Sequence, residues 1–321
     1  MALGMLIDGQ WKTKRDQEDD KGQFVRPSTT FRDWITADGS SGYPAAAGRY
    51  HLYVSYACPW AHRTLLMRQL KGLQEAISLS VVDPYMGEEG WAFSNRPECL
   101  PDTVNDSQYL RQVYLKAEPN FTGRVTVPVL WDKETNAIVN NESREIIRML
   151  DTAFGEIAAT DADFCPADLQ SQIDTVIDQI YEPINNGVYR AGFATQQSAY
   201  ENAFSDLFNA LNHWEAVLDK QRYLCGDRLT EADFCMFTTL LRFDAVYYSH
   251  FKCNLQRIVD YPNLWNYLKD LYQHPGVKET CNLSHIKEHY YRSHPNVNPT
   301  GIVPVGPVID FEAPHDRDRF S

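Results

Sequence analysis

The hydrophobic and polar positions in the first half of the chain predict a strand, a helix and a second strand. Apolar residues alternate with others over 50–56, the two-residue period of a β-strand. Leucines within 65–70 recur at helical spacing, and 77–82 is a second short strand-like run. Two strands joined by a helix make a parallel βαβ unit. A hairpin follows, with apolar strands within 125–131 and 137–139 around a polar turn.

The second half has the longer period of amphipathic helices. Apolar side chains mark one face over 169–184 and another over 203–218. Residues 232–246 are apolar nearly all round, so this helix is expected at the buried centre of a helical domain. It is preceded by Thr230, and Asp233 stands where a capping box usually has Glu or Gln. The pattern therefore predicts an α/β region followed by an all-helical one.

Changes of composition divide the chain into four parts. Residues 1–48 are polar and lack a period, which suits an extended arm that wraps the first domain or a disordered segment. The α/β domain is expected over 49–155 and the helical domain over 166–285, with an Ala-, Asp- and Gly-rich linker around their boundary. Residues 286–321 form a C-terminal extension.

Composition narrows the possible partners and compartments. The net charge of −13 over 321 residues argues against binding to a nucleic-acid backbone, which requires clustered Lys and Arg. The seven cysteines are scattered without paired spacing, which favours a reducing compartment. No apolar run reaches membrane-spanning length and no signal peptide is recognisable, so we expect a cytoplasmic protein without a membrane partner.

The strand-to-helix junction carries the most informative cysteine. Pro59 suits the first helical position, where its missing amide hydrogen costs nothing, so Cys58 is expected at the N-cap. The positive end of a helix stabilises a thiolate, and Arg63 and His62 would add positive potential. The alternative is that Cys58 is packed as a small hydrophobic residue.

This site would have one thiol. A thioredoxin-type redox site has Cys-x-x-Cys, but Ala61 stands where the second cysteine would be. A single thiol cannot resolve its own mixed disulfide, so turnover requires an external thiol. Glutathione is the abundant small thiol of cells, and we therefore expect it as co-substrate.

Two further features lie near the predicted thiol site. Pro128 interrupts an apolar strand, and a cis Val127–Pro128 bond would turn the Val127 backbone toward a peptide-like ligand. A trans proline on an edge strand is the alternative. Glu142 and Ser143 open a helix, where a carboxylate, a hydroxyl and free amides could hold an α-amino acid head group or merely cap the helix.

Two other groups of residues have less specific interpretations. Trp91 lies in a long irregular segment, 83–124, and is either a wall of a substrate pocket or an apolar anchor for the loop. His285 and His289 are four residues apart, but two ligands without a third make a poor metal site. We therefore expect ordinary surface histidines and no metal.

Together these motifs resemble the glutathione site of the glutathione transferases. The Cys-Pro-x-Ala junction, the Val-Pro strand and the Glu-Ser helix start occur in the order and spacing of that family. The resemblance implies a thioredoxin-like N-terminal domain and an all-helical C-terminal domain. It places Cys58 at the glutathione sulfur, the Val127 backbone at the cysteinyl residue, and Glu142 with Ser143 at the γ-glutamyl head. The glutathione-binding residues it implies are Trp91, Arg124, Val127, Glu142 and Ser143.

The C-terminal extension makes the resemblance more specific. Its Tyr-Tyr pair at 290–291, Asn-Pro-Thr at 298–300 and Val-Pro-Val-Gly-Pro at 303–307 are similar to the glutathionyl-hydroquinone reductases, the Xi class of transferases. Cys-Pro-Trp-Ala, Asn-Asn-Glu-Ser and the Arg-Phe-Asp at 242–244 agree, so that the resemblance covers about residues 1–310. It implies thiol-mediated removal of glutathione from an aromatic glutathionyl-hydroquinone by a homodimer. The residues implied in this chemistry are Cys58, Tyr189 and Tyr290, with Trp91 and Tyr247 as aromatic walls.

Two other functions are compatible with a single thiol at a helix N-terminus. One is a thioltransferase or dehydroascorbate reductase of the omega kind, which would need a more open and polar site. The other is a transferase-like binding module without turnover, which would be insensitive to Cys58→Ser. Ordinary conjugation is disfavoured because a nucleophilic protein thiol would compete with bound glutathione.

Overall fold

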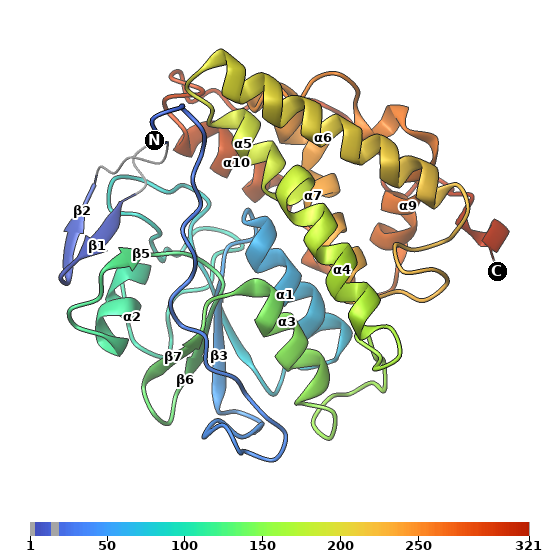
Figure 1. Cartoon of the computed structure of the whole chain (residues 1–321). Helices are drawn as coiled ribbons and strands as arrows, with labels where there is room; N and C mark the ends of the chain where they lie inside the picture. The colour runs from blue at the N-terminus through green and yellow to red at the C-terminus, as the bar shows by residue number, and fades with distance from the viewer. Residues whose placement is uncertain (1–3, 14–18, 321) are drawn as a thin grey trace. The chain divides into compact units, whose positions relative to one another are not determined.

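The computed structural model describes residues 4–13 and 19–320, in two compact units (Figure 1). The first unit comprises Met1–Asp16, Pro27–Ala162 and Ser284–Asn296. The second unit comprises Gln17–Arg26, Asp163–Leu283 and Val297–Ser321. The division at 162–163 lies within the expected linker. The N-terminal arm and the C-terminal extension are each shared between the two units rather than being separate parts.

A four-stranded sheet forms the core of the first unit. Its strand order is β4-β3-β6-β7, with β4 parallel to β3 and the other neighbours antiparallel. All residues of β3 are buried, because the strand lies in the interior of the sheet. The predicted βαβ unit and hairpin are confirmed. The strands are β3 (Tyr50–Val54), β4 (Ser78–Val81), β6 (Val129–Asp132) and β7 (Ala137–Asn140).

Helices of the first unit connect and cover these strands. The helix that follows β3 is α1 (Pro59–Leu70), and it packs beside α3 (Ser143–Thr152) (Figure 1). A short helix, α2 (Leu110–Ala117), lies within the long segment 83–124. A last helix, α10 (Leu283–Ser293), lies almost entirely in this unit although it comes from the C-terminal part of the sequence.

A second, three-stranded sheet has no counterpart among the sequence predictions. Its antiparallel strands are ordered β2-β1-β5, with β1 (Met5–Ile7), β2 (Gln10–Lys12) and β5 (Gly123–Arg124). Asp8 and Gly9 both have positive φ, of 47° and 74°, as a tight hairpin turn requires. The Asp-Gly pair between two apolar runs is the local signal that could have predicted this hairpin.

The second unit is helical, as predicted. Within it α4 and α7 lie side by side, and α6 packs against α5 and α9 (Figure 1). The α-helices are α4 (Gln170–Ile180), α5 (Gly187–Gly192), α6 (Gln197–Leu218), α7 (Glu231–Arg242), α8 (Tyr248–His250) and α9 (Pro262–Gln273). Two segments are π-helical, Tyr181–Asn185 and Phe243–Tyr247. The 3-10 turns are Ile258–Asp260, Lys278–Thr280 and Arg317–Phe320.

The expected central helix of this unit is confirmed. Every residue of α7 is buried, and Thr230 and Asp233 form the predicted capping box at its start. We expected this helix to run to residue 246. The α-helical part ends at Arg242, and a π-helical turn, Phe243–Tyr247, follows it directly.

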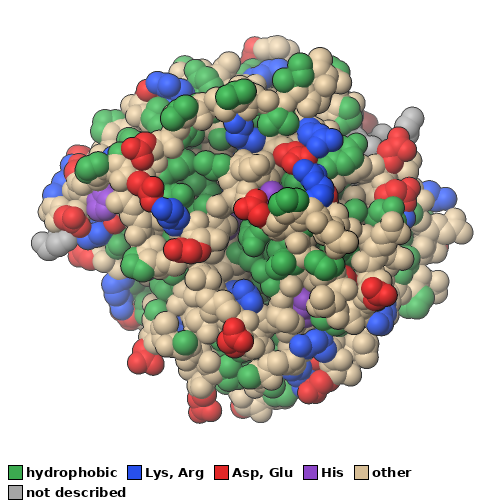
Figure 2. Space-filling view, turned by 180° about the vertical axis from the view of Figure 1, so that it is seen from behind, with side chains coloured by type: hydrophobic (Ala, Val, Ile, Leu, Met, Phe, Trp, Pro, Cys, Tyr) green, Lys and Arg blue, Asp and Glu red, His purple; other side chains and the backbone are tan. Residues whose placement is uncertain are grey.

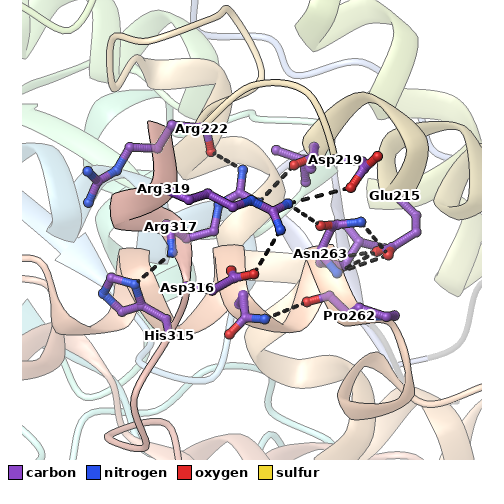
Figure 3. A network of polar contacts seen from close by, with 12 residues as sticks. Glu215, Asp219, Arg222, Pro262, Asn263, His315, Asp316, Arg317 and Arg319 are labelled. Atoms are coloured by element: carbon purple, nitrogen blue, oxygen red, sulfur yellow. Dashed lines mark hydrogen bonds and ion pairs between the residues drawn. The ribbon is translucent and has the colours of Figure 1, made fainter. Parts of the chain in front are cut away.

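A buried arginine near the C-terminus forms hydrogen bonds with the backbone of the second unit (Figure 3). Arg317 is fully buried and donates to the carbonyl oxygens of Leu218, Gln221 and Arg222 at the C-terminal end of α6. Three carbonyls that α6 and the following turn leave without helical partners are satisfied in this way. Residues 311–320, which lie outside the family resemblance, therefore pack as part of this unit.

The central strand of the first unit carries a buried histidine. His51 Nε2 lies 2.9 Å from Ser80 Oγ, and its Nδ1 lies 2.7 Å from Ser78 Oγ. Ser80 donates its hydroxyl proton to the Pro101 carbonyl, so Ser80 Oγ accepts from Nε2–H and Nδ1 accepts from Ser78. These bonds select one neutral tautomer, and burial lowers the pKa of His51 to about 4.

We expect His51 to make the protein less stable in mild acid. The unfolded chain takes up a proton near pH 6.5 and the folded protein only near pH 4, so the stability present above pH 6.5 is lost between these values. The loss at pH 4 is about 3 kcal/mol. Urea unfolding of His51→Asn should show a correspondingly weaker pH dependence than wild type. Equal slopes for His51→Asn and wild type would contradict this prediction.

Candidate active site

The structure places Cys58 at the N-cap of α1, as predicted. Its backbone is extended, with φ −76° and ψ 121°, and Pro59 occupies the first helical turn. The Cys58 carbonyl accepts the first helical hydrogen bond from His62 N at 2.9 Å. The side chain is half-buried, so that it is open to a reactant. A thiolate here benefits from the positive end of the helix.

The other thiols are poorly suited to nucleophilic chemistry near neutral pH. Burial raises the pKa of Cys225 to about 11 and that of Cys281 to about 12. It also raises the pKa values of Cys99 and Cys253. Cys165 and Cys235 are buried as well, so Cys58 is the best candidate for thiol chemistry.

The Val127 carbonyl lies beside the thiol. Cys58 Sγ and Val127 O are 3.6 Å apart, in a geometry in which the thiol donates. Strand pairing explains this approach, because Tyr53 of β3 is paired with Val129 of the antiparallel β6. The residues just after β3 and just before β6 must then meet at one end of the sheet. The Val127–Pro128 bond is cis, so the trans alternative is wrong.

Glu142 and Ser143 open α3 beside the thiol helix. Glu142 is the N-cap and accepts from Arg144 N and from Thr29 Oγ1, both at 3.3 Å. Glu142 thus caps the helix, and its role at a ligand remains a prediction. Ser143 is buried, and its hydroxyl lies 3.4 Å from Arg63 Nη1 of α1. Arg63 thus connects the helix that carries the thiol with the Glu-Ser helix start.

The guanidinium of Arg63 has different surroundings from those expected from the sequence. We expected its charge to add to the potential at Cys58. The guanidinium is instead buried between the two helices, with Cζ 4.5 Å from the Trp60 ring centroid. One of its contacts is with the Ser143 hydroxyl, at the start of α3. A contribution of its charge to the potential at Cys58 remains a prediction.

Trp91 is held by backbone and ring contacts. Only 7% of it is exposed, and its ring stacks on His289 of α10 with centroids 4.7 Å apart. The Trp91 carbonyl accepts from Leu110 N at 2.9 Å. His289 Nδ1 donates to the Pro84 carbonyl at 2.9 Å, which holds the imidazole in place. Such burial supports the anchor interpretation, and the role of Trp91 at a ligand remains a prediction.

The histidines of α10 correct one sequence expectation. His285 and His289 are buried, so the interpretation as surface histidines is wrong. Each packs against an aromatic ring, Tyr56 for His285 and Trp91 for His289. The aromatic-rich sequence of 289–291 was a weak signal of this burial. In the described ranges 4–13 and 19–320, no group of three or more His, Cys, Asp or Glu is arranged to hold a metal.

The predicted tyrosines and Arg124 lie on different elements. Tyr290 is buried on α10, with its ring edge-on to His289 and to His294. Tyr189 belongs to the second unit. Its ring centroid lies 6.0 Å from that of Tyr247 and 5.6 Å from that of Phe251. Arg124 is half-buried on β5. Their roles at a substrate or at glutathione remain predictions.

Comparison with known proteins identifies the family. The models described as "Glutathione S-transferase, N-terminal domain" and "C-terminal domain" match residues 57–153 and 197–270. The structure of the Xi-class transferase from Natrialba magadii covers 100% of this chain and 98% of its own, with a TM-score of 0.95 and 57% identity. This chain belongs to the Xi class of glutathione transferases.

Two named relatives match nearly the whole chain. Glutathionyl-hydroquinone reductase YqjG of Escherichia coli is 52% identical over 99% of this chain and 100% of its own. Its glutathione-bound structure matches with a TM-score of 0.91 at 51% identity, over 98% of this chain and 99% of the other. Glutathionyl-hydroquinone reductase PcpF of Sphingobium chlorophenolicum is 53% identical over 95% and 97% of the two chains. The thioredoxin-like and helical architecture expected from the sequence is thus confirmed.

The surface of this Xi-class transferase carries charges of both signs. On the face drawn in Figure 2, acidic and basic side chains are interspersed rather than gathered into one basic region. Among the residues that the structure describes, no helix is both long enough and apolar enough to span a membrane.

Proposed function

We propose that this protein reduces glutathionyl-hydroquinones to hydroquinones at the expense of glutathione. The observation that carries the proposal is the half-buried Cys58 thiol at the N-terminus of α1, 3.6 Å from the Val127 carbonyl. Identity above 50% with two glutathionyl-hydroquinone reductases supports the substrate class. A nucleophilic thiol with no resolving cysteine in its motif suits a reaction that consumes a second small thiol.

The first step forms a mixed disulfide. The Cys58 thiolate attacks the glutathionyl sulfur of the substrate, and the bond between that sulfur and the aromatic carbon breaks. The carbon receives a proton as it leaves, so the aromatic product is the free hydroquinone. The Cys58 sulfur and the glutathionyl sulfur share the new bond, and the two electrons released by forming this disulfide reduce the carbon.

The second step regenerates the enzyme. A glutathione thiolate attacks the glutathionyl sulfur of the mixed disulfide, forms oxidised glutathione and releases Cys58 as thiolate. The positive end of α1 stabilises that leaving thiolate, which favours this direction of attack. The net reaction consumes one substrate and one glutathione and gives one hydroquinone and one oxidised glutathione.

The glutathione-binding roles follow from the chemistry of each group. The Val127 backbone would pair with the cysteinyl residue as an added strand, because its carbonyl already faces the thiol. Glu142 and Ser143 would hold the ammonium and carboxylate of the γ-glutamyl head at the start of α3. Trp91 and Arg124 complete the proposed set of binding residues. Tyr189 and Tyr290 are the proposed proton donors to the leaving carbon.

The deciding experiment measures both products. Purified protein is incubated with a glutathionyl-hydroquinone and reduced glutathione, while free hydroquinone and oxidised glutathione are quantified. We expect equimolar products. If no hydroquinone forms, the proposal fails; activity on dehydroascorbate or small mixed disulfides would then favour the omega-type alternative, and glutathione binding without turnover would favour a binding module.

We propose in addition that the protein is a cytoplasmic homodimer. Symmetric pairing is the commonest oligomeric arrangement of soluble proteins, and the class resemblance implies it here. Light scattering coupled to size-exclusion chromatography should give twice the mass of one chain. A monomeric mass would contradict the proposal.

A further inference from the structure

The N-terminal hairpin contacts the segment that leads to Val127. In β1, Met5 pairs with Arg124 and Leu6 with Gly123. The turn adds two bonds, from Gly9 N to the Phe121 carbonyl at 3.1 Å and from Asp8 N to Thr122 Oγ1 at 2.8 Å. The backbone of 121–124, three residues before Val127, is therefore one edge of a sheet whose other strands come from the start of the chain.

The other strand of the hairpin contacts the turn that precedes Trp91. Trp11 of β2 donates its indole Nε1–H to the Glu88 carbonyl at 2.9 Å. Its ring lies so close to Gly90 that a Cβ there would be 2.9 Å from Cη2 of the indole. Gly90 has a φ of +78° and its amide bonds to the Gly87 carbonyl at 3.0 Å, so the turn is tight.

Arg111 extends this contact to the start of α2. Its Cζ lies 5.2 Å from the Trp11 ring centroid and 4.3 Å from that of Tyr109. The same guanidinium pairs with the Glu89 carboxylate and donates to the Glu89 carbonyl. The turn before Trp91 is thus enclosed by Trp11, Arg111 and the residues that open α2.

We propose that Trp11 is a positioning residue for glutathione binding. Through one hairpin, the protein connects two segments that are far apart in sequence, the turn before Trp91 and the strand with Arg124. This inference rests on the glutathione-binding roles proposed for those two residues. Holding both segments in place before the ligand arrives lowers the ordering cost of binding, and it does not change the chemistry at Cys58.

The test compares Trp11→Leu and Trp11→Phe with Trp34→Leu. Trp34 is also in the N-terminal part of the first unit, with 38% of its surface exposed, and is the matched control. Affinity for S-methylglutathione, which cannot form a disulfide, is measured by calorimetry, and KM for glutathione and kcat by turnover. We expect Trp11→Leu to raise both Kd and KM about tenfold while kcat stays within about twofold.

Trp11→Phe separates ring packing from the indole hydrogen bond. It keeps an aromatic ring over Gly90 and lacks the donor to Glu88, so its Kd should lie between wild type and Trp11→Leu. Hydrogen exchange of peptides covering 87–92 and 123–127 should accelerate in Trp11→Leu and not in the Trp34 variant. That readout reports the positioning itself, without reference to turnover.

The possible failures are distinguishable. If wild type does not bind S-methylglutathione, the proposed glutathione site is contradicted, whereas the contacts of the hairpin are not. If folded Trp11→Phe and Trp11→Leu bind the ligand as wild type does, the inference is overturned. If Trp11→Leu does not fold, wild-type affinity in folded Trp11→Phe would equally overturn it, because Trp11 would then serve stability alone.

Discussion

Replacement of Cys58 by serine or alanine is expected to reduce turnover by at least about a thousandfold, since the covalent route is then lost. A serine hydroxyl cannot form a mixed disulfide, and alanine offers no nucleophile at all. The other six thiols are poorly placed to substitute, because burial raises the pKa values of Cys99, Cys225, Cys253 and Cys281, and Cys165 and Cys235 are buried. The measurement is release of hydroquinone and oxidised glutathione at saturating substrate.

Two controls keep this prediction specific. Cys281→Ser alters the other half-buried cysteine and should leave turnover unchanged. Cys58→Ser should still bind S-methylglutathione, because the proposed binding groups on β5, α3 and the Val127 backbone are intact. Intact-mass analysis of wild type with substrate alone should show one glutathionyl group on Cys58. Near-normal turnover in Cys58→Ala would show that the reaction does not pass through this thiol.

Asp233→Ala is expected to lower the free energy of unfolding by about 4 kcal/mol, since it leaves several buried donors without an acceptor. Asp233 Oδ1 accepts from Leu224 N and from the Tyr267 hydroxyl, each at 2.8 Å. Its Oδ2 accepts from Thr230 N at 2.8 Å and from Thr230 Oγ1 at 3.0 Å. The carboxylate therefore joins the start of α7 to the preceding loop and to α9.

The pH of this measurement matters. Burial raises the pKa of Asp233 to about 6, so the carboxylate is ionised at pH 7.5 and accepts four hydrogen bonds there. Urea unfolding at that pH compares Asp233→Ala with Asp233→Asn, which keeps one acceptor oxygen and should lose about half as much. The exposed Asp227, replaced by alanine, should change stability by less than about 0.5 kcal/mol. Equal stability of the Asp233 and Asp227 alanine variants would contradict the prediction.

The candidate site was predictable where local chemistry decides the structure. Pro59 follows an alternating strand and places Cys58 at a helix N-cap, because an α-helix accommodates proline readily only in its first turn. The apolar strands on either side of a polar turn predict the hairpin of β6 and β7, as strand pairing confirms. The capping box of α7 follows from the spacing of Thr230 and Asp233 alone.

The pairing partners of distant segments were not predictable in this way. The hairpin of β1 and β2 has a clear Asp-Gly turn, but its partner β5 lies more than a hundred residues later in the chain. The burial of His289 against Trp91 likewise depends on α10 returning to the first unit from the C-terminal part. Such contacts depend on how packed elements complement one another, and sequence periodicity reports only which face of each element is buried.

The sequence by itself thus determined the thiol at a helix N-terminus, the βαβ unit with its hairpin, the helical second half and the class of the protein. Only the tertiary structure decided that Arg63 faces Ser143, that the α10 histidines are buried, and that Trp11 holds the turn before Trp91. The physical reason is the range of the interactions. Caps, turns and periodicity act within a few residues, whereas packing and strand pairing choose among partners that the chain brings together only when it folds.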